Sequence, residues 1–144
     1  MIVIIGCGKS KQDKSCEAEK MYTGKYFKTC LEYAKTFNSP VYILSAEYGL
    51  LRLNDKIQPY DKTLNTMSKK ESLEWANKVK HQILNNNIPL DKVVFLCGKN
   101  YHQHLSSLFS ECVYPLRDLK GMGYQISYML QQLKHQKFSV KKLF

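Results

Sequence analysis

The sequence has few acidic residues and no long hydrophobic run. Its apolar run at residues 2–5 is far too short to cross a bilayer, and Met1 leads into it without the basic residues of a signal peptide. We therefore expect neither a membrane span nor a secretory signal. The five cysteines are an odd number and form no CxxC pair, which argues against a disulfide framework or a zinc ribbon and favours reduced thiols in a cytoplasmic protein.

The scarcity of acidic residues leaves a strong positive charge. The 22 lysines and arginines outnumber the 12 aspartates and glutamates, which gives a formal charge of +10 on 144 residues. This balance favours a polyanionic partner, and we expect nucleic acid, DNA rather than RNA, or a nucleotide. Hydrophobic residues make up 44% and charged residues 24%, as in globular proteins, and the length fits one domain over residues 1–144.

Four strand-like runs alternate with longer helical patterns. The runs at residues 2–5, 41–44 and 93–96 are continuous and apolar, as in strands buried on both faces, and a weaker run follows at 112–114. Helical patterns are expected at about residues 24–37, 68–85 and 101–109, and after residue 123. This alternation predicts a three-layer α/β/α sandwich with a mostly parallel sheet of roughly four strands.

Two of the expected helices carry more specific signals. Ser68 and Glu71 have the spacing of a capping box, and Trp75 behind them is expected in the core. Residues 46–67 form the one long loop, and the basic tail at 134–144 has no assigned structure. The apolar stripes of the second and last helices are expected at Leu73, Ala76, Val79 and Ile83, and at Ile126, Met129, Leu130 and Leu133.

The segments that follow the strands are the candidate ligand site. In an open parallel sheet, ligands bind beyond the carboxyl ends of the strands. Glycines, lysines and tyrosines gather in these segments and before the last helix. The candidate binding residues there are Gly6, Gly8, Lys9, Ser10, Lys11, Ser45, Tyr48, Gly49, Gly98, Tyr101, Gly121 and Gly123.

The loop after the first strand suits a phosphate without matching a standard motif. Only one residue separates Gly6 from Gly8, whereas a P-loop needs four between its glycines, and Lys11 stands where a dinucleotide fingerprint has its third glycine. Lys9 and Lys11 can bind a phosphate that approaches the glycine backbone. The alternative is a tight turn with solvated lysines, and both interpretations stay open.

Cys7 lies in this loop between two glycines and near two lysines. Such a position can lower the pKa of a thiol and make it a nucleophile, with His102 or His104 as a partner in space. The alternative is a small packed thiol. The histidines and cysteines lack the spacing of metal ligands, although His102 and His104 could join Cys7 or Cys97 in space, and we expect no metal and no cofactor.

The long loop mixes aromatic, basic and acidic side chains. Tyr48 and Tyr60 can stack a base, Arg52 can bind phosphate, and Glu47 or Asp61 is the candidate for proton transfer. The alternative is an Ω-loop packed by its own tyrosines.

This loop also carries a family resemblance. Residues 42–52, with Asp55 and residues 58–60, resemble the LSxxYGxLRPxDxxxPY segment of the YaaA peroxide-stress family. Residues 21–24 resemble the VYTG element of that family, and Tyr22, Thr23 and Gly24 complete the candidate binding residues. Nearly the whole chain is similar to a compact, functionally uncharacterised bacterial and phage domain family that has GCGKSK at its start, ILSAxYGLL in the middle and PLxGxGxG before its last helix.

Three functions compete on these grounds. The resemblance to YaaA implies an α/β fold and DNA binding linked to protection from oxidative damage, and a more distant similarity to uracil-DNA-glycosylase-like and archaeosine-pathway domains implies chemistry on a nucleobase. We first expect an enzyme that acts on a nucleobase or nucleotide, free or within DNA, by N-glycosidic or related chemistry. Lys9, Lys11 and Arg52 would then hold phosphate. The alternatives are a non-catalytic DNA-binding or DNA-protecting module and a phage or bacterial protein that binds or inhibits a protein partner.

Overall fold

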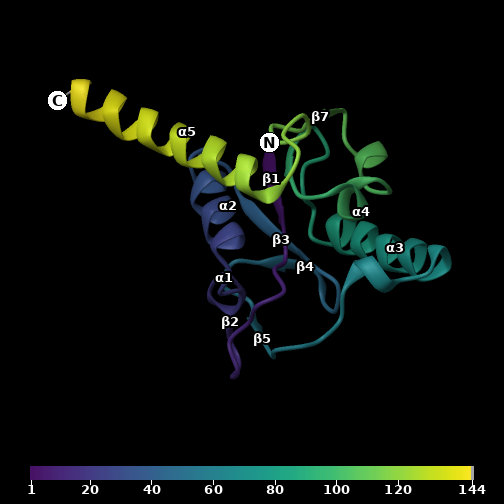
Figure 1. Ribbon diagram of the computed structural model, residues 1–144. Coiled ribbons are helices and arrows are strands. Elements are labelled where there is room, and N and C mark those ends of the chain that lie inside the picture. Colours follow the sequence, from purple (N-terminus) through teal and green to yellow (C-terminus); the bar gives the residue numbers. More distant parts are fainter. Residues whose placement is uncertain (144) are drawn as a thin grey trace.

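A five-stranded sheet forms the centre of the protein (Figure 1). The computed structural model describes the backbone of residues 1–143 and the side chains of residues 1–136. The strand order is β4-β3-β1-β6-β7. The predicted mostly parallel sheet is confirmed, with one strand more than expected. Strands β1 (Ile2–Gly6), β3 (Val41–Ser45), β6 (Lys92–Leu96) and β7 (Glu111–Val113) are parallel, whereas the edge strand β4 (Gly49–Arg52) is antiparallel to β3.

Helices cover both faces of this sheet, as predicted for a three-layer sandwich. Helix α2 (Lys25–Lys35) packs against α5 (Met122–Leu143) on one face, and α3 (Lys69–Asn85) lies on the opposite face (Figure 1). The alternation of side chains along β1 serves both layers, because a buried parallel strand points successive residues to opposite faces. Val3 and Ile5 belong to the core beside α2 and α5, while Ile2 and Ile4 belong to the core beside α3.

Helix α3 begins and packs as its capping box and Trp75 predict. Its capping box is confirmed, because the Glu71 N–H donates to Ser68 Oγ at 3.1 Å and the Ser68 N–H donates to Glu71 Oε1 at 3.1 Å. Trp75 is buried, and its indole N–H donates to the Ser45 carbonyl oxygen at 2.9 Å. Two residues of the expected apolar stripes are partly exposed to solvent, Leu73 (40%) and Leu130 (43%). Each lies at the edge of the buried face of its helix.

Several elements differ from the expected ones. The helix expected at 101–109 is two short pieces, α4 (Lys99–His102) and the 3-10 turn η2 (Ser106–Leu108), because the Leu105 N–H closes a turn on the His102 carbonyl oxygen at 2.9 Å. Helix α5 continues through residue 143, and residue 144 of the expected tail lies outside the described residues. The long loop contains structure of its own: strand β4, strand β5 (Lys56–Ile57), which pairs with β2 (Cys16–Glu17) before α1 (Ala18–Met21), and the 3-10 turn η1 (Leu64–Thr66).

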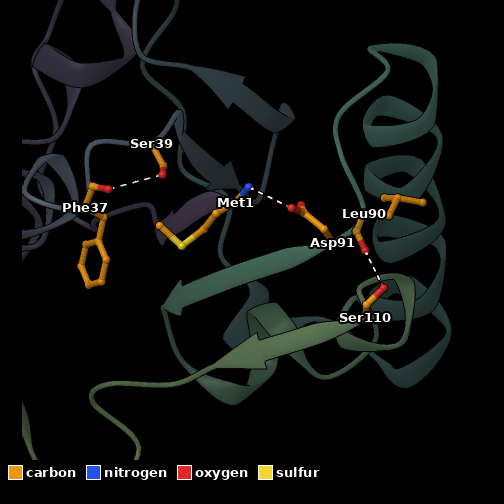
Figure 2. A network of polar contacts seen from close by, with 6 residues as sticks. All are labelled: Met1, Phe37, Ser39, Leu90, Asp91 and Ser110. Carbon is orange, nitrogen blue, oxygen red and sulfur yellow. Dashed lines mark hydrogen bonds and ion pairs between the residues drawn. The ribbon is translucent and has the colours of Figure 1, made fainter.

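The edge of the sheet at the amino ends of the strands is closed by short polar contacts (Figure 2). The Met1 ammonium group lies 3.2 Å from Asp91 Oδ2, which ties the beginning of β1 to the beginning of β6. Nearby, the Ser110 hydroxyl donates to the Leu90 carbonyl oxygen at 3.4 Å. The carboxyl ends of the parallel strands lie at the opposite edge, which is where ligands bind in open parallel sheets. In the part of the chain that the structure describes, no helix is both long and apolar enough to cross a membrane.

Candidate functional site

Strand β1 is the point at which the chain changes direction across the sheet. The connection through α2 leads from β1 to β3 on one side, and the next parallel strand, β6, lies on the other side of β1. In open parallel sheets, such a switch point leaves a crevice beyond the carboxyl ends of the strands. The loop after β1 is therefore placed where a ligand site is expected.

A pocket of 870 Å³ occupies this crevice. Its walls come from the loop after β1, the first turn of α2, residues 61–65, the end of β6 with Tyr101, and the beginning of α5. The volume lies within the range of about 300–1,000 Å³ that is common for small-molecule sites. Eleven of the predicted site residues line it: Gly6, Cys7, Gly8, Lys9, Ser10, Lys11, Gly24, Asp61, Gly98, Tyr101 and Gly121.

The charge in this pocket is strongly positive. The lysines that line it are Lys9, Lys11, Lys25 and Lys62, and Asp61 is the one carboxylate among its described lining residues. Unpaired ammonium groups around a cavity raise the local concentration of anions. The pocket can therefore attract an anionic ligand and offers it one acid or base.

Backbone hydrogen bonds hold the lysine-bearing loop in place. The Thr23 N–H donates to the Ser10 carbonyl oxygen at 3.0 Å, and Lys11 forms a β-bridge with Tyr22. The Lys11 ammonium donates to the Lys9 carbonyl oxygen at 3.1 Å and lies 4.5 Å from the centre of the Tyr60 ring, a cation–π contact. The loop is therefore ordered by its own backbone contacts, which both the phosphate-binding loop and the tight turn with solvated lysines require.

Cys7 is half buried on the wall of the pocket. Its thiol lies 3.4 Å from the Tyr101 hydroxyl, and burial raises the pKa of Tyr101 well above its ordinary value. The phenol therefore stays protonated and can donate to sulfur. His102 and His104 do not line this pocket, so the structure does not supply the histidine partner that a nucleophilic Cys7 was expected to use.

A hydrogen-bonded cluster of tyrosines lies beside the loop. The Tyr60 hydroxyl is 2.7 Å from the Tyr22 hydroxyl and accepts from Ser45 Oγ at 2.9 Å. Desolvation raises the pKa of Tyr22 to about 12, and the pKa of Tyr60 is raised further in the same way. The Tyr48 ring meets the Tyr60 ring edge-on with a centre separation of 5.8 Å. Tyr48 and Tyr60 thus pack against each other and do not line the pocket as free stacking surfaces.

Arg52 is not brought to the pocket. Strand β4 runs back antiparallel to β3, so Arg52 pairs with Tyr42 at the amino end of β3, the opposite edge of the sheet. Its guanidinium donates there to Asn86 Oδ1 at 3.3 Å. The prediction that Arg52 shares a phosphate with the lysines assumed that the residues after β3 continue past the edge, and the hairpin reverses them.

Other predicted residues also lie outside the pocket wall. Glu47 is exposed in the turn between β3 and β4, where its carbonyl oxygen accepts from Lys78 Nζ at 3.0 Å. Gly49 lies in the same hairpin, and Gly123 lies in the first turn of α5 without lining the cavity. Of the two candidate carboxylates, the pocket therefore contains Asp61.

The structure adds lining residues that the sequence did not single out. Lys25 and Lys62 directly follow Gly24 and Asp61, so their positions in the chain were a usable signal. Tyr26 donates a hydrogen bond to Gln125 Oε1, which joins α2 to α5 on the wall of the cavity. The further lining residues are Phe27, Thr63, Asn65, Leu96, Cys97, Met122 and Ile126.

The described residues include no cluster of three or more histidine, cysteine, aspartate or glutamate side chains that could hold a metal ion. The possible grouping of His102 and His104 with Cys7 or Cys97 is therefore not formed. A cofactor would have to be held by the lysines and backbone of the pocket itself.

These features define an α/β protein with a basic pocket at the switch point of a mostly parallel sheet. Residues 2–131 match the family of unknown function DUF6884, and the chain belongs to that family. The matched region contains every residue that lines the pocket. The chain is also 31% identical over 136 residues to the uncharacterized protein YfjM of Bacillus subtilis (strain 168), with 87% of this chain and 89% of YfjM covered. The predicted membership of an uncharacterised family is confirmed.

Proposed function

We propose that the protein binds a nucleotide, free or as a unit of DNA, in the pocket at the end of β1 and acts on its nucleobase. The observation that carries this proposal is the lining of the 870 Å³ cavity, which combines Lys9, Lys11, Lys25 and Lys62 with the single carboxylate of Asp61. The formal charge of +10 and the similarity of the long loop to the YaaA family support a polyanionic partner.

The first turn of α2 strengthens the case for phosphate. Gly24 is the N-cap residue of α2, so no side chain at this position bonds the free N–H groups of the helix. The first turn of α2 contains no acidic residue. The N–H groups of that turn have no partner within the helix, and the aligned peptide dipoles favour an anion there. Gly24 and Lys25 both line the cavity, so the helix terminus and an ammonium group act on the same space.

An apolar wall faces the remaining volume. Tyr26, Met122 and Ile126 line the pocket, and Met122 is 66% exposed. A nucleobase has a flat, weakly polar face that such side chains can cover. The ligand would then place its phosphate on the lysines and its base against α2 and α5.

Asp61 is the residue to which we assign proton transfer. In an N-glycosidic cleavage, water attacks the sugar carbon as its bond to the base breaks, and a carboxylate that accepts the proton of this water assists the step. The leaving base takes a proton from solvent, so the reaction consumes one water molecule. Asp61 is exposed to the cavity and can carry out this transfer without a metal or cofactor in the scheme.

Paired variants test this proposal. We expect Lys62→Ala to weaken the binding of nucleoside monophosphates about tenfold, because one charge-assisted contact is lost. The matched control is Lys56→Ala, an exposed lysine on β5 outside the cavity, which should bind as the wild type does. Asp61→Asn should keep the affinity and abolish the release of free base, measured by chromatography. Equal losses in both lysine variants, or full turnover by Asp61→Asn, would contradict the assignment.

The positive charge also supports a second candidate, a DNA-binding module without catalysis. It predicts that the binding of DNA weakens with salt. A plot of log K against log salt concentration should fall with a slope of about 0.9 for each phosphate contacted, and free nucleotides should not bind. A fluorescent duplex and a single strand titrated across a salt series separate the two candidates. Binding that is independent of salt would exclude the module.

A further inference from the structure

A second, smaller pocket adjoins the first. It has a volume of 570 Å³ and shares Tyr26, Cys97, Gly98 and Gln125 with the larger one, so the two cavities are neighbours. The remaining lining comes from Phe95 on β6, from α4 and the residues after it, and from the segment between β7 and α5. None of the predicted phosphate-binding lysines of the first pocket lines it.

Basic side chains dominate this second pocket. Lys99 and Arg117 line it together with His102, and its described lining residues include no carboxylate. The Arg117 guanidinium carbon lies 3.9 Å from the centre of the Tyr114 ring, which holds the planar group by a cation–π contact. A guanidinium fixed in this way loses less conformational freedom when it binds an oxyanion.

His102 is unusual among the residues that line this pocket. Its Nδ1 is buried and has no hydrogen-bond partner among the described residues. The ring lies 4.7 Å from the Tyr114 ring and 5.4 Å from the Phe95 ring, measured between centres. A buried polar atom without a partner is rare in folded proteins and calls for a physical explanation.

The charges around His102 act in the same direction. Burial lowers the pKa of His102, and the nearby Arg117 and Lys99 lower it further. The charged groups that act on the ring therefore come from α4 and from the segment after β7, and both are cations. An anion beside Lys99 and Arg117 would offset their charges and favour protonation of His102.

We infer that the second pocket binds a phosphoryl group, with Lys99 and Arg117 as its cationic contacts and His102 beside them. Two neighbouring cations and a histidine that can gain a proton suit a doubly charged oxyanion better than a single carboxylate. The group can be free phosphate or the phosphate of a neighbouring nucleotide unit. The site adjoins the pocket proposed for the base, but Lys99, His102 and Arg117 line the second pocket alone, so its filling does not depend on a nucleotide in the first.

The direct test follows the His102 ring by NMR in the intact protein. Sulfate is the probe, because it stays doubly charged across the titration, and chloride at equal ionic strength controls for screening. Assignment of the His102 signal uses His102→Gln. We expect sulfate to raise the pKa of His102 by about one unit, which corresponds to about tenfold tighter sulfate binding to the protonated form. An equal shift in sulfate and chloride would overturn the proposal.

A matched pair of arginine variants gives the second readout. Arg117→Ala should remove the sulfate-specific shift, while Arg52→Ala, at the opposite edge of the sheet, should retain it. Inorganic phosphate and a short single-stranded oligonucleotide then distinguish the two sources, since an effect of phosphate alone identifies a free anion and an effect of the oligonucleotide identifies a nucleotide unit. Loss of the shift in both arginine variants, or in neither, would contradict the site. A nucleotide effect at Lys62 in a protein whose His102 shows no sulfate-specific shift would refute the second pocket while sparing the first.

Discussion

Gly49 offers the sharpest test of the hairpin that turns the chain away from the pocket. Its φ is +76°, a conformation that side chains with a Cβ rarely adopt, and a Cβ built there would lie 2.3 Å from Gln82 Oε1. The Gln82 side chain is flexible, so the clash itself is relieved by moving it. However, Gln82 Oε1 accepts from the Leu50 N–H at 2.8 Å, and Gln82 Nε2 donates to the Tyr48 carbonyl oxygen at 3.0 Å.

The cost of Gly49→Ala therefore has two parts. The left-handed backbone costs about 1 kcal/mol with a Cβ present. Displacing Gln82 costs about 1 kcal/mol for each of its two hydrogen bonds. We expect Gly49→Ala to lower the free energy of unfolding by about 3 kcal/mol, and Gln82→Ala to lower it by about 2 kcal/mol.

The double variant separates these parts. Gln82→Ala already removes both hydrogen bonds, so adding Gly49→Ala cannot remove them again. The double variant should therefore lower the free energy of unfolding by about 3 kcal/mol, and not by about 5 kcal/mol, the sum of the two single variants. Urea unfolding of the four proteins measures this coupling, provided that the slope with denaturant stays constant. Strictly additive costs would show that Gln82 does not couple to Gly49, and a neutral Gly49→Ala would refute the strained turn. Gly123→Ala, in the first turn of α5 with no atom within 4 Å of its Cβ, is the control for removing a glycine.

Two further predictions concern the buried phenols and thiols. Tyr60→Phe removes the hydroxyl that links Tyr22 and Ser45 and should lower the free energy of unfolding by about 1–3 kcal/mol, whereas Tyr124→Phe, on a side chain that is 73% exposed, should change little in the same urea assay. Burial raises the pKa of Cys30 from 9.0 to about 12 and that of Tyr22 from 10.0 to about 12. Because both groups ionise more easily in the unfolded chain, the stability they contribute is complete below pH 9 and should fall as the pH rises from 9 to 12. Thermal unfolding that is independent of pH over this interval would contradict their burial.

The parallel strands and the main helices could be predicted from local patterns. Continuous apolar runs mark β1, β3 and β6, because strands buried on both faces need apolar residues at every position. The capping box at Ser68 marks the beginning of α3. Strand β4 escaped prediction because it is a short edge strand at the start of a long loop, and its pairing depends on β3 instead of on its own pattern.

The site shows the same division between local and long-range information. The glycine and lysine loop after β1 was recognisable, since strand ends in parallel sheets attract ligands. Arg52 lies away from the edge expected for it, because the hairpin of β3 and β4 carries the chain back to the amino end of β3. The meeting of α5 with the first turn of α2 depends on tertiary packing, so the roles of Tyr26 and Gln125 were not visible in the sequence.

The most direct test of the central claim is to map nucleotide binding on the backbone amides by NMR. We expect nucleoside monophosphates to shift the amide signals of residues 6–11, 24–27 and 61–65, which surround the pocket after β1. The signals of β4 near Arg52 should stay unchanged, because that strand end lies at the opposite edge of the sheet. Shifts confined to other surfaces, or no shifts with any nucleotide or oligonucleotide, would contradict a nucleotide site at the end of β1.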